Sequence, residues 1–196
     1  MEQDITYAIL LRLDEDTQRQ VMAFREHWMQ HQPDVLLMPP QITIKSFFRP
    51  CVPCGTLIQR LQVSLQDFPP VPLHLGEQRW LADGTLHWDG SLMSTGEQNM
   101  DLLHLKTKVW STIMSLVSLF CEFTPGEPFS YRTNNPWQPG VPLLKQMTQY
   151  SSDLSMLPEV PAPRSASGMV MDLYRVRMNH GQPMDWEHVT AFPAAR

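Results

Sequence analysis

The stretch PPQITIKSFF, residues 39–48, decides how the rest of the chain is interpreted. Two prolines precede a run in which apolar and polar side chains alternate. A period of two predicts a half-buried β-strand, and its polar residues Gln41, Thr43 and Lys45 are expected on one face. An amide, a hydroxyl and an ammonium group in a row suit a phosphate or another oxyanion. The alternative is the solvated polar face of an edge strand.

The composition of the whole chain limits the classes of function. The 196 residues are 42% hydrophobic and 18% charged, with a formal net charge of −5. This predicts one globular domain, or two small lobes that share a core. The acidic balance argues against extended DNA binding, so a contact with nucleic acid should be local. No stretch is apolar enough to span a bilayer and the N-terminus does not resemble a signal peptide, so we expect a cytoplasmic protein.

The metal-binding residue types do not gather into a convincing site. Cys51 and Cys54 form a single CxxC pair with no second pair to complete a zinc site. His27 and His31 lie one helical turn apart, but no third ligand is near them in the sequence. We therefore expect loop cysteines, a solvated helix face, no metal and no cofactor.

The periodicity along the chain predicts an α+β protein with antiparallel sheets. The run ITYAILLRL (5–13) is nearly all apolar and indicates a central strand, and Asp-Gly at 83–84 is a strong hairpin signal. The other expected strands cover 41–48, 73–76, 80–81, 86–88, 141–147, 169–177 and 186–192. The first expected helix starts at the acidic residues 14–17 and continues to a stop at 31–33. The other expected helices cover 56–68 and 97–120, with a short helical turn within 151–163.

Two stretches together resemble the 2H phosphoesterase superfamily, the 2′-5′ RNA ligase and cyclic phosphodiesterase-like proteins. Its signature is Pro-His-hydrophobic-Thr-hydrophobic, and PQITI at 40–44 is similar to a first copy. PGVPLL at 139–144 lies where the second copy should fall. The order of elements extends the resemblance over nearly the whole chain. It implies one domain, 1–196, of two pseudo-symmetric lobes, with antiparallel sheets lining a central groove and helices outside.

The family's chemistry needs two histidines, one as a base on the attacking oxygen and one as an acid on the leaving oxygen. The threonines hold the non-bridging oxygens. In this chain Gln41 and Gly140 stand at the histidine positions, and Pro142 stands at the second threonine position. Only Thr43 matches. Gln41 cannot carry a proton, and Pro142 should weaken an interior strand, so the family reaction by the family mechanism is not expected.

The resemblance still implies a groove in which a phosphate-bearing ligand could bind. The candidate ligand-binding residues on its two walls are Gln41, Thr43, Lys45, Tyr131, Arg132 and Lys145. The aromatic and cationic members of the loop before the second motif could stack on and clamp a nucleotide. The alternative for that loop is that its aromatic side chains tuck it onto the surface.

A further His-x-Thr sequence occurs near the end of the chain, at His188 and Thr190. It follows the position of the second motif, and the two side chains would share one strand face. The pattern favours a half-exposed strand, with His188 as a displaced catalytic candidate. His74 and His87 flank the hairpin and are expected at ordinary polar positions of exposed strands.

The leading hypothesis is a degenerate, catalytically inactive member of the family that binds a nucleotide or an RNA end, because both histidines are lost. One alternative is an interaction or regulatory protein with a vestigial groove and a protein partner. Another is an active phosphoesterase that uses His188. If the positions are assigned correctly, Gln41→His with Gly140→His and Pro142→Thr should restore some turnover.

Overall fold

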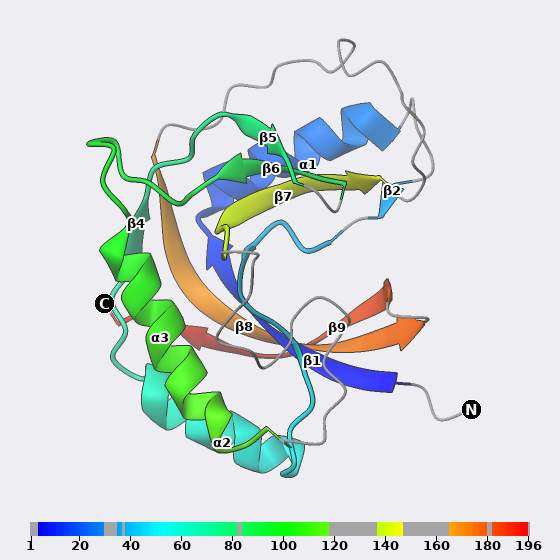
Figure 1. Ribbon diagram of the computed structural model, residues 1–196, viewed down its shortest axis with the longest axis vertical. Helices are drawn as coiled ribbons and strands as arrows, with labels where there is room; N and C mark the ends of the chain where they lie inside the picture. Colours follow the sequence, from blue (N-terminus) through cyan, green and yellow to red (C-terminus); the bar gives the residue numbers. More distant parts are fainter. Residues whose placement is uncertain are drawn as a thin grey trace.

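Two antiparallel sheets and three helices make up the described part of the chain (Figure 1). The computed structural model describes residues 4–29, 35–36, 38–81, 84–117, 137–146, 165–179 and 182–195. The helices are α1 (Glu15–Met29), α2 (Cys54–Leu65) and α3 (Met100–Met114). The strands are β1 (Asp4–Leu13), β2 (Val35–Leu36), β3 (Ile42–Phe48), β4 (Val71–Leu73), β5 (Gln78–Trp80), β6 (Thr85–Asp89), β7 (Gly140–Gln146), β8 (Ala166–Asn179) and β9 (Gln182–Pro193).

The larger sheet is built on the long strand β8. One edge of β8 pairs with β1, which in turn pairs with β3, and the other edge pairs first with β4 and then with β9. The smaller sheet has the order β2-β7-β6-β5. All of these pairings are antiparallel, as the sequence predicts.

Strand β1 is covered on both faces, which explains its nearly continuous apolar sequence. The side chains of Ile9 and Leu11 belong to the main core beneath the helices, and Ala8 and Leu10 belong to a second cluster on the opposite face. The prediction of a central strand at 5–13 is confirmed. The face that carries Ala8 and Leu10 is also the one on which the polar site lies, because Arg12 follows Leu10 by two residues.

The helices pack on different sheets. α2 and α3 lie together on one face of the larger sheet, whereas α1 lies against the smaller sheet (Figure 1). Arg25 of α1 is buried and donates hydrogen bonds to the carbonyl oxygens of Leu143 (2.8 Å) and Pro142 (2.8 Å) in β7. Burial lowers the pKa of Arg25 to about 10. The α1–β7 contact is therefore held partly by a charged group that has left water.

Among the elements that differ from the sequence prediction are β2 and α3. β2, only two residues long, was not expected and pairs only with Lys145 and Gln146. Because β2 is so short, no described strand pairs with Pro142 on that side, and its missing N–H is tolerated inside a sheet. α3 ends at Met114, before the expected limit at 120, and residues 118–120 lie outside the described part. No described helix is long and apolar enough to cross a membrane.

Candidate functional site

A buried carboxylate, Asp172 of β8, is the centre of the polar site. Its side chain is 0% exposed. Arg12 of β1 donates to both of its oxygens, with 2.7 Å between Nε and Oδ2. Gln41 Nε2 donates to Oδ2 at 2.9 Å, and His188 Nε2 of β9 lies 2.9 Å from Oδ1. Several donors thus surround the carboxylate, as the burial of this group requires.

Tyr174 extends this Asp172 cluster along β8. Its hydroxyl oxygen accepts a hydrogen bond from Gln41 Nε2 at 3.2 Å, and its ring meets the His188 ring edge-on with centroids 5.4 Å apart. Burial and then the nearby charge of Asp172 raise the pKa of Tyr174. The hydrogen bond to Asp172 raises the pKa of Arg12. The phenol therefore stays neutral and the guanidinium stays charged at neutral pH.

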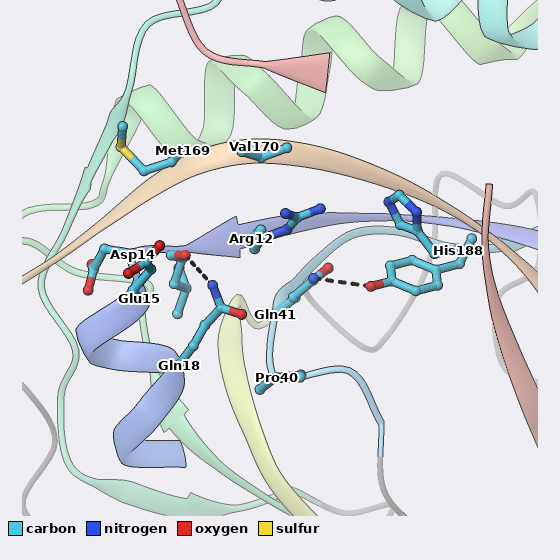
Figure 2. A pocket seen from close by; sticks show the side chains of 11 residues that line it. Arg12, Asp14, Glu15, Gln18, Pro40, Gln41, Met169, Val170 and His188 are labelled. Carbon is cyan, nitrogen blue, oxygen red and sulfur yellow. Dashed lines mark hydrogen bonds between the residues drawn. The ribbon is translucent and has the colours of Figure 1, made fainter. Parts of the chain in front are cut away.

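The cluster borders a cavity of about 800 Å³ (Figure 2). His188 lies on one side of the cavity, Asp14 and Glu15 at the start of α1 lie on the other side, and Arg12 and Gln41 lie between them. The described lining residues are Arg12, Leu13, Asp14, Glu15, Gln18, Pro40, Gln41, Met169, Val170, Tyr174 and His188. The cavity is thus lined by an imidazole on one side and carboxylates on the other, with a guanidinium between them.

Asp14 fixes the acidic end of the cavity. Its carboxylate accepts hydrogen bonds from the backbone N–H of Thr17 (2.9 Å) and of Ser167 (2.8 Å). Although burial acts in the opposite direction, these bonds lower the pKa of Asp14. Asp14 therefore caps α1 and ties it to the beginning of β8. This leaves the neighbouring Glu15, which is exposed, as the more accessible carboxylate there.

No protein-family model matches the sequence, and no curated protein matches it either. Solved structures do match. LigT of E. coli in its apo form aligns with a TM-score of 0.60 at 14% identity over 100% of both chains. TT0787 of Thermus thermophilus aligns with a TM-score of 0.66 at 12% identity, over 96% of this chain and 97% of the other. This chain has the LigT fold.

The LigT fold confirms the expected two-lobed α+β architecture with two antiparallel sheets. A protein described as a phosphoesterase is also similar, with a TM-score of 0.62 and 14% identity over 97% of this chain and 98% of the other. Further LigT structures are complexes with 3′-AMP, with phosphate and with ATP. At these identities the likeness establishes the fold of this chain and nothing finer.

On this LigT-like fold, the prediction that Lys45 shares a face with Gln41 and Thr43 is wrong. The β1–β3 ladder has an irregularity. Thr43 pairs with Leu10, but the residue that pairs with Ile9 is Lys45 and not Ile44. One extra residue in a strand reverses the alternation of faces. Gln41 and Thr43 remain on the site face, whereas the Lys45 ammonium lies 4.9 Å from the ring centroid of Trp110 on α3.

Gly140 belongs to the predicted second motif and is buried where β7 starts. A Cβ added there would lie 2.6 Å from His87 Nδ1 and 2.7 Å from the carbonyl oxygen of Trp88. His87 is 4% exposed, so the prediction that it lies on an exposed strand is wrong. His87 is buried because Gly140 has no side chain. The imidazole of His87 in β6 packs into the space that a side chain at position 140 would occupy.

The two motifs approach each other, but they do not line one described cavity. Trp137, three residues before Gly140, donates from Nε1 to the backbone carbonyl of Thr43 at 3.0 Å. The beginning of β7 is therefore anchored beside β3. Gln41 lines the cavity, whereas Gly140 and Pro142 are not among its described lining residues.

His188 does lie at the site, but Thr190 does not share its face. In the β8–β9 ladder His188 pairs with Tyr174 and Thr190 pairs with Leu173, with an irregularity between the two pairs. His188 is 44% exposed, beside Asp172 and at the cavity. The prediction of a shared face is therefore wrong, because a ladder irregularity reverses the alternation of faces here as it does before Lys45.

Three predicted ligand-binding residues cannot be placed in the site. Tyr131 and Arg132 lie outside the described residues. The backbone of Lys145 pairs with Thr85 and Leu36 in the smaller sheet, and its side chain is outside what the structure describes. Within the described ranges no three His, Cys, Asp or Glu side chains are grouped as a metal site would require.

The central residues of the site, Asp172 and Arg12, were not singled out from the sequence. Each is a charged residue inside an apolar or β-prone run, ILLRL for Arg12 and MVMDLYRV for Asp172. A charge in such a run needs a partner when it is buried. The sequence therefore indicates that Arg12 and Asp172 each need a partner. It does not show that they are each other's partner, because that depends on the register of β1 against β8.

Proposed function

We propose that this chain binds the phosphate of a nucleotide or of an RNA end in the cavity beside Asp172. The observation that carries the proposal is that Asp172 holds the Arg12 guanidinium in place at the cavity. Its Nε and Nη2 are held by Asp172, and Nη1 has no partner among the described residues. The side chain is 34% exposed and lines the cavity. A pre-oriented guanidinium in a concave site is suited to an oxyanion.

His188 supplies a second group for the same anion. Its Nε2 is occupied by Asp172, so Nδ1 is the ring nitrogen left to face a ligand. Thr43, on the same face as Gln41, is the family threonine that remains. LigT, with which this chain shares a fold, forms complexes with phosphate and with 3′-AMP. This supports a phosphate-bearing ligand here, with Tyr131, Arg132 and Lys145 as candidates beyond the described cluster.

The proposal does not include the family reaction by the family mechanism. Gln41 does not titrate near neutral pH, and Gly140 has no side chain, so neither family position holds an acid or a base. Each missing proton-transfer group typically costs about 10²–10⁴-fold in rate. Arg12 and His188 therefore support phosphate binding without the family's proton transfer. A vestigial, filled groove that serves only a protein partner fits less well, because the cavity is open.

Isothermal titration calorimetry with 3′-AMP, inorganic phosphate and adenosine tests the binding proposal. We expect heat with the first two and none with adenosine, which lacks the phosphate. Arg12→Gln should weaken 3′-AMP binding by about tenfold or more. The matched control is Arg19→Gln, an exposed arginine of α1 outside the cavity, which should change affinity less than about twofold. Absence of heat with any phosphate compound would end the proposal.

One specific observation favours a second candidate, a phosphoesterase that uses His188. The imidazole forms a pair with a buried carboxylate at 2.9 Å, an arrangement that orients a general base. If this is correct, the chain should hydrolyse a 2′,3′-cyclic nucleotide, and His188→Ala should abolish turnover. A wild-type protein that binds 3′-AMP but leaves the cyclic nucleotide intact would exclude this candidate.

A further inference from the structure

Two thiols lie at the start of α2, on the face of the larger sheet opposite to the Asp172 cluster (Figure 1). Cys51 is exposed in the loop before the helix, and Cys54 is the half-buried first residue of α2. Both are free thiols, and neither lines the cavity beside Asp172. They form a pair of nucleophiles that the proposed function does not use.

The loop between the two thiols is held at both ends. The N–H of Cys51 donates to the carbonyl oxygen of Leu116 at 2.7 Å. The carbonyl oxygen of Pro53 accepts from the N–H groups of Thr56 (3.0 Å) and Leu57 (3.2 Å), and the proline ring fixes a further backbone torsion. The chain also bends at Cys51. Little conformational freedom is therefore lost when the two sulfur atoms join.

The start of α2 favours negative charge on the sulfur of Cys54. Pro53 at the N-cap gives no side-chain acceptor to the first N–H groups of the helix, and no acidic residue occupies the first turn. The N-terminal end of a helix carries a partial positive charge, and thiolates are stabilised there. Cys54 is therefore better suited than the exposed Cys51 to act as the attacking thiolate.

Tyr7 of β1 supplies an independent donor to the same sulfur. Its buried side chain forms hydrogen bonds through the hydroxyl with the Arg175 guanidinium and with the Cys54 thiol. Because a guanidinium only donates, the phenol proton is left for the sulfur. Burial raises the pKa of Tyr7, so the hydroxyl keeps that proton at neutral pH. An O–H donor bound by a cation thus faces Cys54.

We propose that Cys54 and Cys51 are a modification site, a dithiol that a hydroperoxide oxidises to a disulfide. The pair suits this chemistry better than metal binding, because no third His, Cys, Asp or Glu joins it in the part of the chain that the structure describes. The inference is independent of the proposed function, since the thiols and the cavity lie on opposite faces of the sheet.

The reaction has two steps. The Cys54 thiolate attacks one peroxide oxygen, the O–O bond breaks, and the other oxygen leaves as water after taking up a proton, so that Cys54 becomes a sulfenic acid. The Cys51 sulfur then attacks the Cys54 sulfur, the S–S bond forms, and the hydroxyl leaves as water with the proton of the Cys51 thiol. The sulfur atoms lose two electrons, which reduce the peroxide. A dithiol reductant reverses the modification.

The test treats the reduced full-length chain with hydrogen peroxide, blocks the remaining thiols with N-ethylmaleimide and maps the tryptic peptide 46–60, which contains both cysteines. We expect this peptide to lose two hydrogen atoms and to carry no maleimide, whereas the third cysteine, Cys121, is blocked. Dithiothreitol should restore both thiols. In the same chain unfolded by urea, the disulfide should form about tenfold more slowly, because the helix start and the Tyr7 donor are gone.

Tyr7→Phe tests the donor on protein in which Cys51→Ser and Cys121→Ser leave Cys54 as the only thiol. The variant removes the hydroxyl and keeps the ring, which lies 6.2 Å from that of Phe48. We expect alkylation of Cys54 by iodoacetamide to slow about threefold or more. Thermal melts confirm that each variant is folded.

A matched pair of arginine variants separates the Tyr7 contact from general surface charge. Arg175→Gln removes the cation that binds the Tyr7 hydroxyl and should also slow alkylation of Cys54. Arg177→Gln removes a neighbouring arginine of β8 that pairs with Asp185, and it should leave the rate unchanged within about twofold.

Three results overturn the inference. One is that peroxide leaves both thiols free or joins either of them to Cys121. Another is that the folded chain forms the disulfide no faster than the chain in urea. The third is that folded Tyr7→Phe protein is alkylated as fast as its parent. Phosphate binding in the cavity stands or falls separately, because calorimetry with 3′-AMP on the reduced protein measures it without these thiols.

Discussion

The starts of β3 and β7, which the sequence predicts to carry the two motifs, have opposite environments. At β3, Gln41 belongs to a polar cluster with Asp172 and borders an open cavity. At β7, Gly140 is packed against His87 and a backbone carbonyl, with no room for a side chain. One half borders a cavity, and the other is part of the packed interior. The two positions are therefore physically different.

This comparison is most sharply tested by Gly140→His. Any side chain at this position meets His87 Nδ1 and the carbonyl oxygen of Trp88 at less than 3 Å, and the backbone contact cannot move away. We expect a loss of roughly 3 kcal/mol or more in the free energy of unfolding, measured by urea denaturation. The restoration of turnover by Gln41→His, Gly140→His and Pro142→Thr is consequently no longer expected.

A control for that variant combines Gly140→Ala with His87→Ala. It should recover part of the loss seen in Gly140→Ala alone, because one of the two close contacts is removed. No recovery would mean that the Trp88 carbonyl sets the limit. A Gly140→His protein as stable as wild type would show that the β7 half is not a packed site, and the contrast between the halves would be lost.

The next largest effect is expected at Asp172→Asn. The change leaves Arg12 and His188 beside a neutral amide, and it places an N–H₂ group among their donors. Breaking a buried pair costs about 3–5 kcal/mol, but Arg12 is one-third exposed, so we expect roughly 2–3 kcal/mol. Urea denaturation gives the loss, and calorimetry should show weakened 3′-AMP binding. Asp16→Asn, whose carboxylate is exposed on α1, is the matched control.

Arg25→Met tests the support of the β7 half. The variant removes two hydrogen bonds to β7 carbonyls, but it also removes a buried charge whose lowered pKa shows an unfavourable environment. These effects partly cancel, so we expect a loss of about 1–2 kcal/mol. Chemical denaturation measures it. An increase in stability would mean that Arg25 does not anchor β7 to α1.

The smallest effect is expected for Gln41→His at the β3 half. An imidazole nitrogen can replace Nε2 as a donor to Asp172, and the open cavity allows the ring to adjust. We expect less than about 1 kcal/mol of destabilisation, with a measurable change in nucleotide affinity. A cost as large as that of Gly140→His would show that the starts of β3 and β7 are packed equally tightly.

The sequence predicts the architecture well because the apolar periodicity reports burial directly. The apolar run at 5–13 and the alternation at 41–48 correspond to β1 and β3, and the resemblance predicts the two-lobed fold that the LigT comparison confirms. The short strand β2 carries too few residues to show a period. The predicted helix runs past Met114, where α3 ends, because apolar residues continue into the non-helical segment that follows.

The site could be predicted only in part, because face assignment depends on register. Strict alternation places Lys45 with Gln41 and places Thr190 with His188, and an irregularity in each ladder separates both pairs. Nothing local in the sequence marks either irregularity, since no glycine or proline is present there. The role of Asp172 depends on side chains from β1, β8, β9 and the residue before β3, which no single stretch of sequence encodes.

Trp137 gives the molecule an optical reporter for the geometry between its two motifs. Its indole nitrogen binds the Thr43 carbonyl of β3, the ammonium of Lys106 in α3 lies 4.3 Å from its ring centroid, and β7 begins three residues later. A fluorine label on this one ring would therefore sense three elements at once. Ligand entry that separates the strands would change its resonance, even where the ligand never touches it.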